Sequence, residues 1–372
     1  FAGGVEAAAS TGGQVLPPVM GATAFIIAEF TQTPYSQVAL YALFPALLYF
    51  LGVFFMVHLE AKKEGISRLA KDEIPPLLPT LARGLHNLVP LGALIGMLVA
   101  GYSPMKAGLY AIILVVAMSW LRKDTRMMPR DVTLALRDGA LNSLVIVMAC
   151  ATAGIIVGSI SITGLGLKFS ALVINLSGGY LIPALLLTAM ASLVLGMGMI
   201  SISAYVILSS LAAPALVNMG ALPVAAHLFV YFFGVLSNVT PPICVAAFTA
   251  AGIAGAGQII TGLTATRLAG VAFVIPFMFV IDPRLMLVGE PLELVLPIIS
   301  ALVGVWAFAG ALQGYLLTRI NHLERIALAV GSLALLSTNS LSDVIGVSCL
   351  GAVFLFQVVR LRQQEPTRYS GE

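Results

Sequence analysis

Long apolar runs separated by short charged segments form the main hydropathy pattern of this chain. A helix needs about 20 apolar residues to cross the hydrocarbon core of a bilayer. Runs that approach or exceed this length recur along the chain, at about residues 35–57, 88–102, 105–121, 142–163, 268–282, 294–318, 326–340 and 342–359. The pattern predicts an all-α membrane protein, a polytopic bundle of transmembrane helices.

Three further stretches are apolar but interrupted by helix-breaking residues. Residues 2–30 contain Gly12-Gly13 and Pro17-Pro18, residues 222–257 contain Asn238 and Pro241-Pro242, and residues 180–220 contain Gly196-Met197-Gly198. A break at membrane depth must be buried in protein, because its free backbone groups find no partner in lipid. We expect broken helices at 2–30 and 222–257. We expect a re-entrant hairpin at 180–220, with its tip from Gly196 to Ser203.

Two amphipathic segments lie between charged loops and the next apolar run, at residues 77–88 and 131–143. Leu77, Leu81 and Leu85 recur at helical spacing, which suits a helix lying in the membrane interface. Both a moving arm and a simple connector fit this pattern.

Composition excludes several classes of protein. The chain is 59% hydrophobic and 9% charged, whereas a soluble domain carries roughly 25% charged residues. The net charge of +3 comes from short basic clusters between apolar runs, so no basic face is expected for nucleic acid. Cys150, Cys244 and Cys349 are far apart and have no CxxC neighbour, which argues against a disulfide framework or a metal site. The expected environment is the lipid bilayer.

The basic residues orient the predicted spans, because lysine and arginine concentrate in cytoplasmic loops. Only Lys106, Lys168 and Arg284 fall on the outer side, so 16 of the 19 basic residues share one face. The others are Lys62, Lys63, Arg68, Lys71, Arg83, Arg122, Lys123, Arg126, Arg130, Arg137, Arg267, Arg319, Arg325, Arg360, Arg362 and Arg368. This count requires residues 180–220 to enter and leave by the outer side, as a re-entrant hairpin does.

A short motif occurs twice. Residues 13–18 and 237–242 both read small residue, side-chain amide, Val, one variable position and Pro-Pro. By the charge argument the two copies cross the membrane in opposite directions, which predicts an inverted-topology repeat. Paired interrupted helices of this kind indicate a binding site near the membrane midplane. A proline kink used only for packing is the alternative interpretation.

The chemistry around these breaks favours a small cation. Proline lacks an N–H and clashes with a carbonyl one turn earlier, so Pro-Pro frees carbonyl oxygens. Neutral oxygens of carbonyls, Ser201, Ser237 and Thr240 suit an alkali cation, and we expect Na⁺. No Asp or Glu falls at the middle of a span, so a carboxylate proton relay has no obvious members, although proton coupling stays an alternative.

No feature of the sequence indicates an enzyme. The chain has no phosphate-binding Gly-Lys motif. His58, His86, His227 and His322 lie near predicted span ends without a paired nucleophile. We expect no catalytic residue and no cofactor other than the coupling ion.

The motifs resemble those of a known family. The opening segment, Gly4 through Gln14, is followed by Pro17-Pro18, Met20-Gly21 and Ala28-Glu29-Phe30; Gly196-Met197-Gly198, residues 211–216 and Thr240-Pro241-Pro242 agree in the second half. Over residues 1 to about 285 the chain is similar to the large permease of tripartite ATP-independent periplasmic (TRAP) transporters, in its TAXI-type fused variety. It departs at Ile200, Ser201 and Ile202, where the family usually has Pro-Thr-Thr after an apolar residue.

The resemblance implies a multi-pass permease of the bacterial inner membrane with an elevator motion. It would import an organic anion, a carboxylate or amino acid, delivered by a periplasmic substrate-binding protein and driven in most members by Na⁺. A small-permease domain fused upstream, or a separate small-permease subunit, is a further expected partner. The hairpin of the first repeat would precede residue 1, so we expect the chain to be N-terminally truncated.

The resemblance also assigns candidate residues. The first cation site would use carbonyls near Gly13 and Leu16, and the second would use Ser237, Thr240 and the tip around Ser201. We expect the substrate to face Gln14, Gly198, Ser203 and Asn238. An uncoupled channel or a structural membrane subunit is the alternative from another class.

These expectations divide the chain into four parts. Residues 1–33 would be the remainder of the first transport-domain repeat, and residues 34–140 would be scaffold helices and interfacial arms. Residues 141–285 would form the second repeat, with its hairpin at 180–220 and its broken helix at 222–257. Residues 286–372 would add C-terminal transmembrane helices and a cytoplasmic tail.

Overall fold

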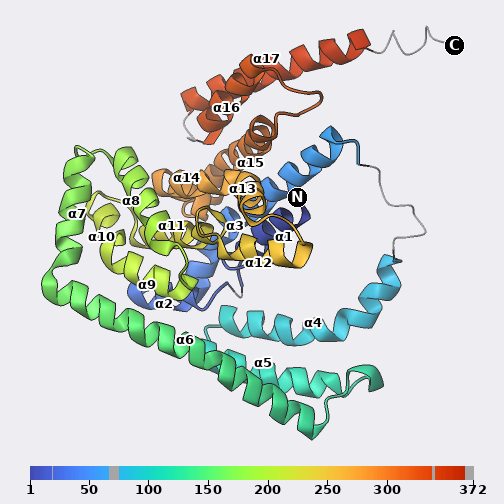
Figure 1. Cartoon of the computed structure of the whole chain (residues 1–372), viewed down its shortest axis with the longest axis vertical. Coiled ribbons are helices and arrows are strands. Elements are labelled where there is room, and N and C mark those ends of the chain that lie inside the picture. The colour runs from blue at the N-terminus through green and yellow to red at the C-terminus, as the bar shows by residue number, and fades with distance from the viewer. Residues whose placement is uncertain (19, 67–74, 337–339, 365–372) are drawn as a thin grey trace.

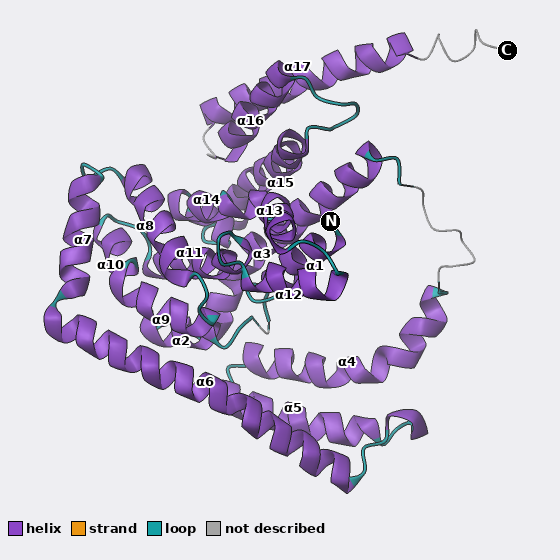
Figure 2. Cartoon of the chain, viewed as in Figure 1, coloured by secondary structure: helices purple, strands orange, loops and turns teal. Residues whose placement is uncertain are grey.

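The computed structural model describes residues 1–18, 20–66, 75–336 and 340–364, and these residues form helices and connecting turns without a β-strand (Figure 2). Within these described ranges, five helices are long and apolar enough to cross a membrane, or six when one bent pair is counted as a span. The predicted all-α, polytopic membrane protein is therefore confirmed. The predicted cytoplasmic residues Arg68, Lys71 and Arg368 lie outside the described residues.

Two broken helices form the centre of the molecule (Figure 1). The first consists of α1 (Ala2–Gly12) and α2 (Thr23–Phe30), and the second of α11 (Pro223–Leu236), the short η2 (Ser237–Val239) and α12 (Val245–Ala254). The predicted interruptions at both Pro-Pro pairs are confirmed, and both Pro-Pro peptide bonds are cis. Helix α1 packs on α12, while α2 packs on α11. The first half of each broken helix therefore packs on the second half of the other, as expected when the two broken helices run in opposite directions.

The predicted hairpin is present as two helices, α8 (Leu181–Gly196) and α9 (Ser201–Leu211), both packed on α11. The turn between them is shorter than predicted. It occupies residues 197–200, and Ser201, Ile202 and Ser203 already belong to the first turn of α9. Gly198 has a φ of +72°, a left-handed conformation that favours glycine. Helix α10 (Ala213–Asn218) follows, with Pro214 in its first turn.

The long helix α3 (Tyr35–Lys63) lines the central body and packs on α1 and α13 (Gln258–Leu268). The prediction of an uninterrupted span at 268–282 is wrong. Helix α13 begins ten residues earlier, and the chain bends by 63° before continuing through η3 (Gly270–Phe273) and α14 (Ile275–Ile281). Pro276 lies in the first turn of α14, a position where a helix tolerates proline.

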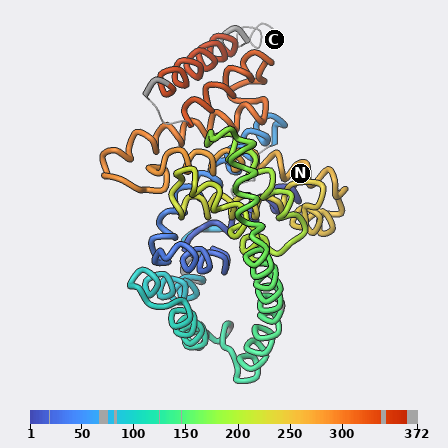
Figure 3. The backbone as a smooth tube through the Cα atoms, turned by 90° about the vertical axis from the view of Figure 1, so that its left-hand side faces the viewer, coloured from blue at the N-terminus to red at the C-terminus, as the bar shows by residue number. Residues whose placement is uncertain are grey.

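Helices α4 (Leu77–Val99), α5 (Pro104–Ser119) and α6 (Pro129–Thr163) form an arm beside the body (Figures 1 and 3). The amphipathic segments predicted at 77–88 and 131–143 are continuous with the following spans, so the structure has one helix where two elements were expected in each case. Only the last part of α6 packs on the body, against α9. Helix α6 ends at Gly164, whose φ of +64° turns the chain into α7 (Leu165–Leu176).

The C-terminal helices lie at the opposite end of the molecule from the α4–α6 arm (Figures 1 and 3). They are α15 (Pro291–Gln313), α16 (His322–Leu336) and α17 (Ser340–Gln364), close to the three spans predicted there. Helix α15 follows the short η4 (Pro283–Met286) and packs on α3. The three C-terminal helices are thus attached to the central body through α15.

A buried polar network joins these C-terminal helices. The carboxylate of Glu324, which is only 7% exposed, accepts a hydrogen bond from the Arg360 guanidinium at 2.6 Å. The fully buried side chain of Gln357 accepts from the backbone N–H of Leu317 at 3.0 Å. These contacts join the α15–α16 connection to α17. Breaking the pair would leave a buried charge without its partner, which is strongly unfavourable.

Candidate functional site

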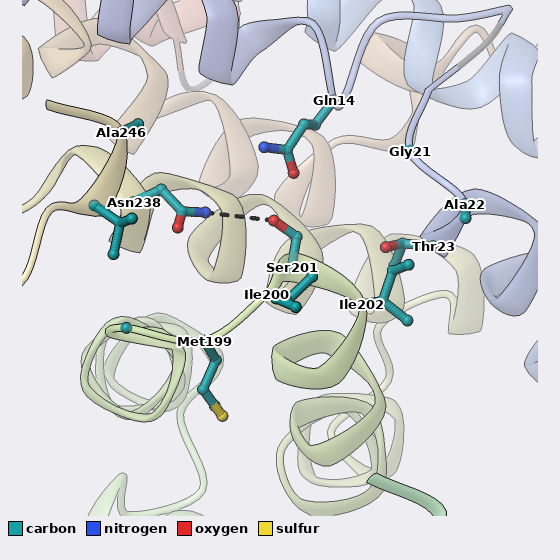
Figure 4. A pocket seen from close by; sticks show the side chains of 12 residues that line it. Gln14, Gly21, Ala22, Thr23, Met199, Ile200, Ser201, Ile202, Asn238 and Ala246 are labelled. Carbon is teal, nitrogen blue, oxygen red and sulfur yellow. Dashed lines mark hydrogen bonds between the residues drawn. The ribbon is translucent and has the colours of Figure 1, made fainter. Parts of the chain in front are cut away.

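A pocket of about 490 Å³ lies where the hairpin turn meets the two helix breaks (Figure 4). Both repeats contribute to its wall, which consists of Gln14, Gly21, Ala22, Thr23, Gly198, Met199, Ile200, Ser201, Ile202, Asn238, Val245 and Ala246. None of these described lining residues carries a charge. The wall therefore combines apolar surface with a few neutral amide and hydroxyl groups, the usual composition of a site for a small molecule.

Three helices begin at this pocket. Ala22 and Thr23 start α2, Ser201 starts α9, and Val245 starts α12. The first backbone N–H groups of a helix have no partner within the helix, and the helix dipole places roughly half a positive charge at this end. The convergence of three such ends brings backbone N–H donors to the uncharged pocket. Anionic groups bind at sites of this kind.

On the first-repeat side, the loop between α1 and α2 is held by hydroxyl groups from other helices. The Gln14 carbonyl accepts a hydrogen bond from the Gly21 N–H at 2.9 Å and a second from the Tyr231 hydroxyl at 2.7 Å. The Tyr35 hydroxyl donates to the carbonyl of Pro18. These bonds satisfy carbonyls that Pro-Pro removes from the helix, which explains how the break is tolerated inside the bundle.

On the second-repeat side, hydroxyl side chains likewise donate hydrogen bonds to backbone carbonyls of the break. The Thr266 hydroxyl of α13 donates to the Val239 carbonyl at 2.7 Å. The hydroxyls of Ser237 and Thr240 donate to the carbonyls of Gly234 and Leu236, also at 2.7 Å. Each of these hydroxyl oxygens keeps lone pairs that can accept from a donor or bind a cation.

The amide of Asn238 connects the second break to the hairpin. Its Nδ2 donates to Ser201 Oγ at 3.4 Å and to the Val235 carbonyl at 3.2 Å. The side chain of Gln14 extends toward this pair from the opposite wall (Figure 4). The two amides of the repeated motif thus face one pocket, as expected for residues at corresponding positions of two repeats.

The predicted site residues fall into three groups. Gln14, Gly198, Ser201 and Asn238 line the pocket together. Gly13, Leu16, Ser237 and Thr240 lie in the two breaks and are not among the residues that line the pocket. Ser203 lines a different cavity.

That second cavity, of about 350 Å³, separates the hairpin from α6. Ser203 lines it together with Thr152 and Met148 of α6. Met199 and Ile200 line both cavities, so the hairpin turn is the wall between them.

Several residues of the site carry no signal that the sequence analysis used. Ala22 and Thr23 line the pocket because α2 begins there, and Val245 and Ala246 do so because α12 begins there. The Pro-Pro pairs indicate where one helix ends. They do not indicate where the next helix begins, and it is the first residues of that next helix that line the pocket. The role of Tyr231 depends on a partner in the other repeat, which no local pattern reveals.

The fold and pocket define a class: a multi-pass membrane transporter with a substrate-sized site between two broken helices and a hairpin. A family model described as "Tripartite ATP-independent periplasmic transporter, DctM component" matches residues 1–293. The chain belongs to this family and is a large permease component of a TRAP transporter. A search among curated proteins found no match. The family is one of transporters, not enzymes, and its members work with a periplasmic binding protein and a small permease.

Proposed function

We propose that this chain moves an organic anion, a carboxylate or an amino acid, across the bacterial inner membrane after a periplasmic binding protein has delivered it. The observation that carries this proposal is the convergence of the N-termini of α2, α9 and α12 on one pocket without charged side chains. Each helix end contributes partial positive charge. Inside a protein this charge acts through a lower dielectric than in water, which strengthens its attraction for a carboxylate.

A second part of the proposal concerns the driving ion. Ser237 is fully buried, and a Cβ added at Gly196 would lie 2.8 Å from its hydroxyl oxygen. The end of α8 therefore lies directly against the second break. Neutral oxygens of Ser237 and Thr240 there, together with carbonyls near Gly13 and Leu16, are the ligand type that Na⁺ accepts. Cations bound at the two breaks would add to the attraction for an anionic substrate, so that each ligand favours binding of the other.

A third part concerns motion. The hairpin turn separates the substrate-sized pocket from the cavity against α6, and α6 belongs to the arm that lies beside the body. We propose that the body formed by the broken helices and the hairpin slides along α6 as an elevator. The boundaries 1–33, 34–140, 141–285 and 286–372, the TAXI type and the fusion to a small permease stay predictions.

Counterflow in proteoliposomes tests the substrate class. The complete transporter that contains this chain is reconstituted with its binding protein, and exchange of a radiolabelled dicarboxylate, monocarboxylate or amino acid is competed with unlabelled acids and their neutral amides. Competition by at least one acid but not by its amide supports the proposal. Equal competition by an acid and its amide would show that the pocket does not select a negative charge.

A further inference from the structure

One tyrosine ties the two repeats together at the pocket wall. Tyr231 belongs to α11 of the second repeat, is fully buried, and donates its hydroxyl hydrogen to the Gln14 carbonyl of the first repeat at 2.7 Å. The same carbonyl accepts from the Gly21 N–H at 2.9 Å. With two donors in place, this oxygen is a structural acceptor. Gln14 acts on the pocket through its side-chain amide.

The surroundings of the Tyr231 hydroxyl leave little freedom. A Cβ added at Gly21 would lie 3.1 Å from the Tyr231 oxygen, so the absence of a side chain at this position makes room for the tyrosine. The ring of Tyr205 contacts that of Tyr231 edge-on, with centroids 5.9 Å apart. Tyr205 is in turn hydrogen-bonded to Nδ1 of His227 at 2.7 Å. Tyr231 is thus held by aromatic packing and presents its hydroxyl to one acceptor.

We infer that Tyr231 is a positioning residue for transport. It does not line the pocket, but through Gln14 and Gly21 it fixes the loop that carries the first-repeat half of the wall. Because it extends from the second repeat, it makes the geometry of the first break depend on that of α11. For its effect on uptake this inference rests on the proposed function, whereas its effect on the loop is measurable without transport.

Amide hydrogen exchange of the purified complex in nanodiscs, with NaCl in the buffer, tests the inference. Tyr231→Phe keeps the ring and leaves the Gln14 carbonyl bonded to Gly21, so it removes only what the Tyr231 hydroxyl contributes to this loop. We expect exchange in residues 13–24 to become about fivefold faster, the factor that loss of one ordinary hydrogen bond represents. Tyr205→Phe is the matched control, because it deletes a hydroxyl contact of the same aromatic cluster but none to this loop.

The outcomes are distinct. Faster exchange in residues 13–24 for Tyr231→Phe alone supports the inference. Unchanged exchange for Tyr231→Phe would overturn it, and so would an equal increase for Tyr205→Phe, which would attribute the effect to aromatic packing.

A double-mutant cycle supplies a second, independent measure. Gly21→Ala places a methyl group against the Tyr231 oxygen, so its effect on loop exchange should shrink when residue 231 is Phe. Additive effects would contradict a direct contact. Because counterflow of a carboxylate is a separate measurement, failure of the proposed function leaves the exchange result standing, and failure of the exchange result leaves the substrate class standing.

Discussion

Asn238 in the second helix break donates a hydrogen bond to Ser201 in the first turn of α9, with 3.4 Å between Nδ2 and Oγ. This contact joins the hairpin to the break at the pocket (Figure 4). It orients the N-terminus of α9, whose free N–H groups are part of the proposed anion site. The arrangement of the pocket therefore depends on a side chain that the repeated motif places at a fixed position.

Removing this amide should weaken substrate binding. Asn238→Ala deletes the bond to Ser201 and one polar group of the wall, and we expect KM for the transported acid to rise by about three- to tenfold, as for one or two lost hydrogen bonds. Michaelis–Menten analysis of uptake measures this effect. Ser209→Ala on α9, whose hydroxyl bonds only to the Val206 carbonyl of its own helix, is the control. An unchanged KM for Asn238→Ala would remove this residue from the site.

Two serines of the hairpin should differ in effect. Ser201 lines the substrate-sized pocket, whereas Ser203 lines the cavity against α6. We expect Ser201→Ala to raise KM by about threefold and Ser203→Ala to leave KM unchanged while altering the maximal rate, because its cavity lies where the body would slide. Initial uptake rates over a range of substrate concentrations separate the two parameters. A larger KM effect for Ser203→Ala would contradict the assignment of the pockets.

The contact between Gly196 and Ser237 provides a test of the ion site. Gly196→Ala would bring a methyl group to 2.8 Å from the Ser237 hydroxyl oxygen, so the break must shift. We expect the Na⁺ concentration for half-maximal uptake to rise by about tenfold, as for a loss of about 1.4 kcal/mol of binding free energy. Gly252→Ala on α12 is the matched control, because no atom lies within 4 Å of its added Cβ. Equal Na⁺ dependence in both variants would separate Ser237 from the ion site.

The network in the C-terminal helices predicts a stability effect. Arg360→Ala removes the charged partner of the Glu324 carboxylate, which is 7% exposed and keeps only hydrogen bonds from neutral groups of Asn321 and Gln357. We expect the free energy of unfolding to fall by about 3 kcal/mol. Denaturant titration of the purified protein in detergent measures the loss. Lys63→Ala, which breaks the ion pair with Glu60 on α3, should cost less than about 1 kcal/mol. Similar losses in both variants would mean that the Glu324 pair is not effectively buried.

The sequence predicted those parts of the fold that local chemistry decides. Proline and glycine act on the backbone of their own turn, so the breaks at Pro17-Pro18 and Pro241-Pro242 and the turn at Gly198 were recognisable without a structure. The repeated motif also placed Gln14 and Asn238 at corresponding positions, and both line the pocket. Helix α13, which precedes the bend at residue 269, was not predicted, because its sequence is too polar to read as part of the apolar run that begins at residue 268.

Ser203 and Tyr231 show why the rest of the site was less predictable. With both residues treated as part of one hairpin tip, Ser201 was predicted at the cation site and Ser203 at the substrate. Residues two apart in a helix are rotated by about 200° about its axis and so lie on nearly opposite faces, and α9 begins at Ser201. Tyr231 donates to a carbonyl 217 residues away. A contact of that kind arises from the tertiary arrangement of the two repeats and leaves no trace in a short window of sequence.

Uptake into proteoliposomes is the most direct test of the central claim, that this permease accumulates an organic anion by using a cation gradient. The complete transporter is reconstituted with its binding protein, and uptake of labelled dicarboxylates and amino acids is followed with an inward Na⁺ gradient, with a proton gradient alone and with neither. The account predicts accumulation of an acid above its equilibrium level only with the Na⁺ gradient and the binding protein. Accumulation driven by protons alone would contradict the ion assignment, and uptake that never exceeds the substrate gradient would contradict coupled transport.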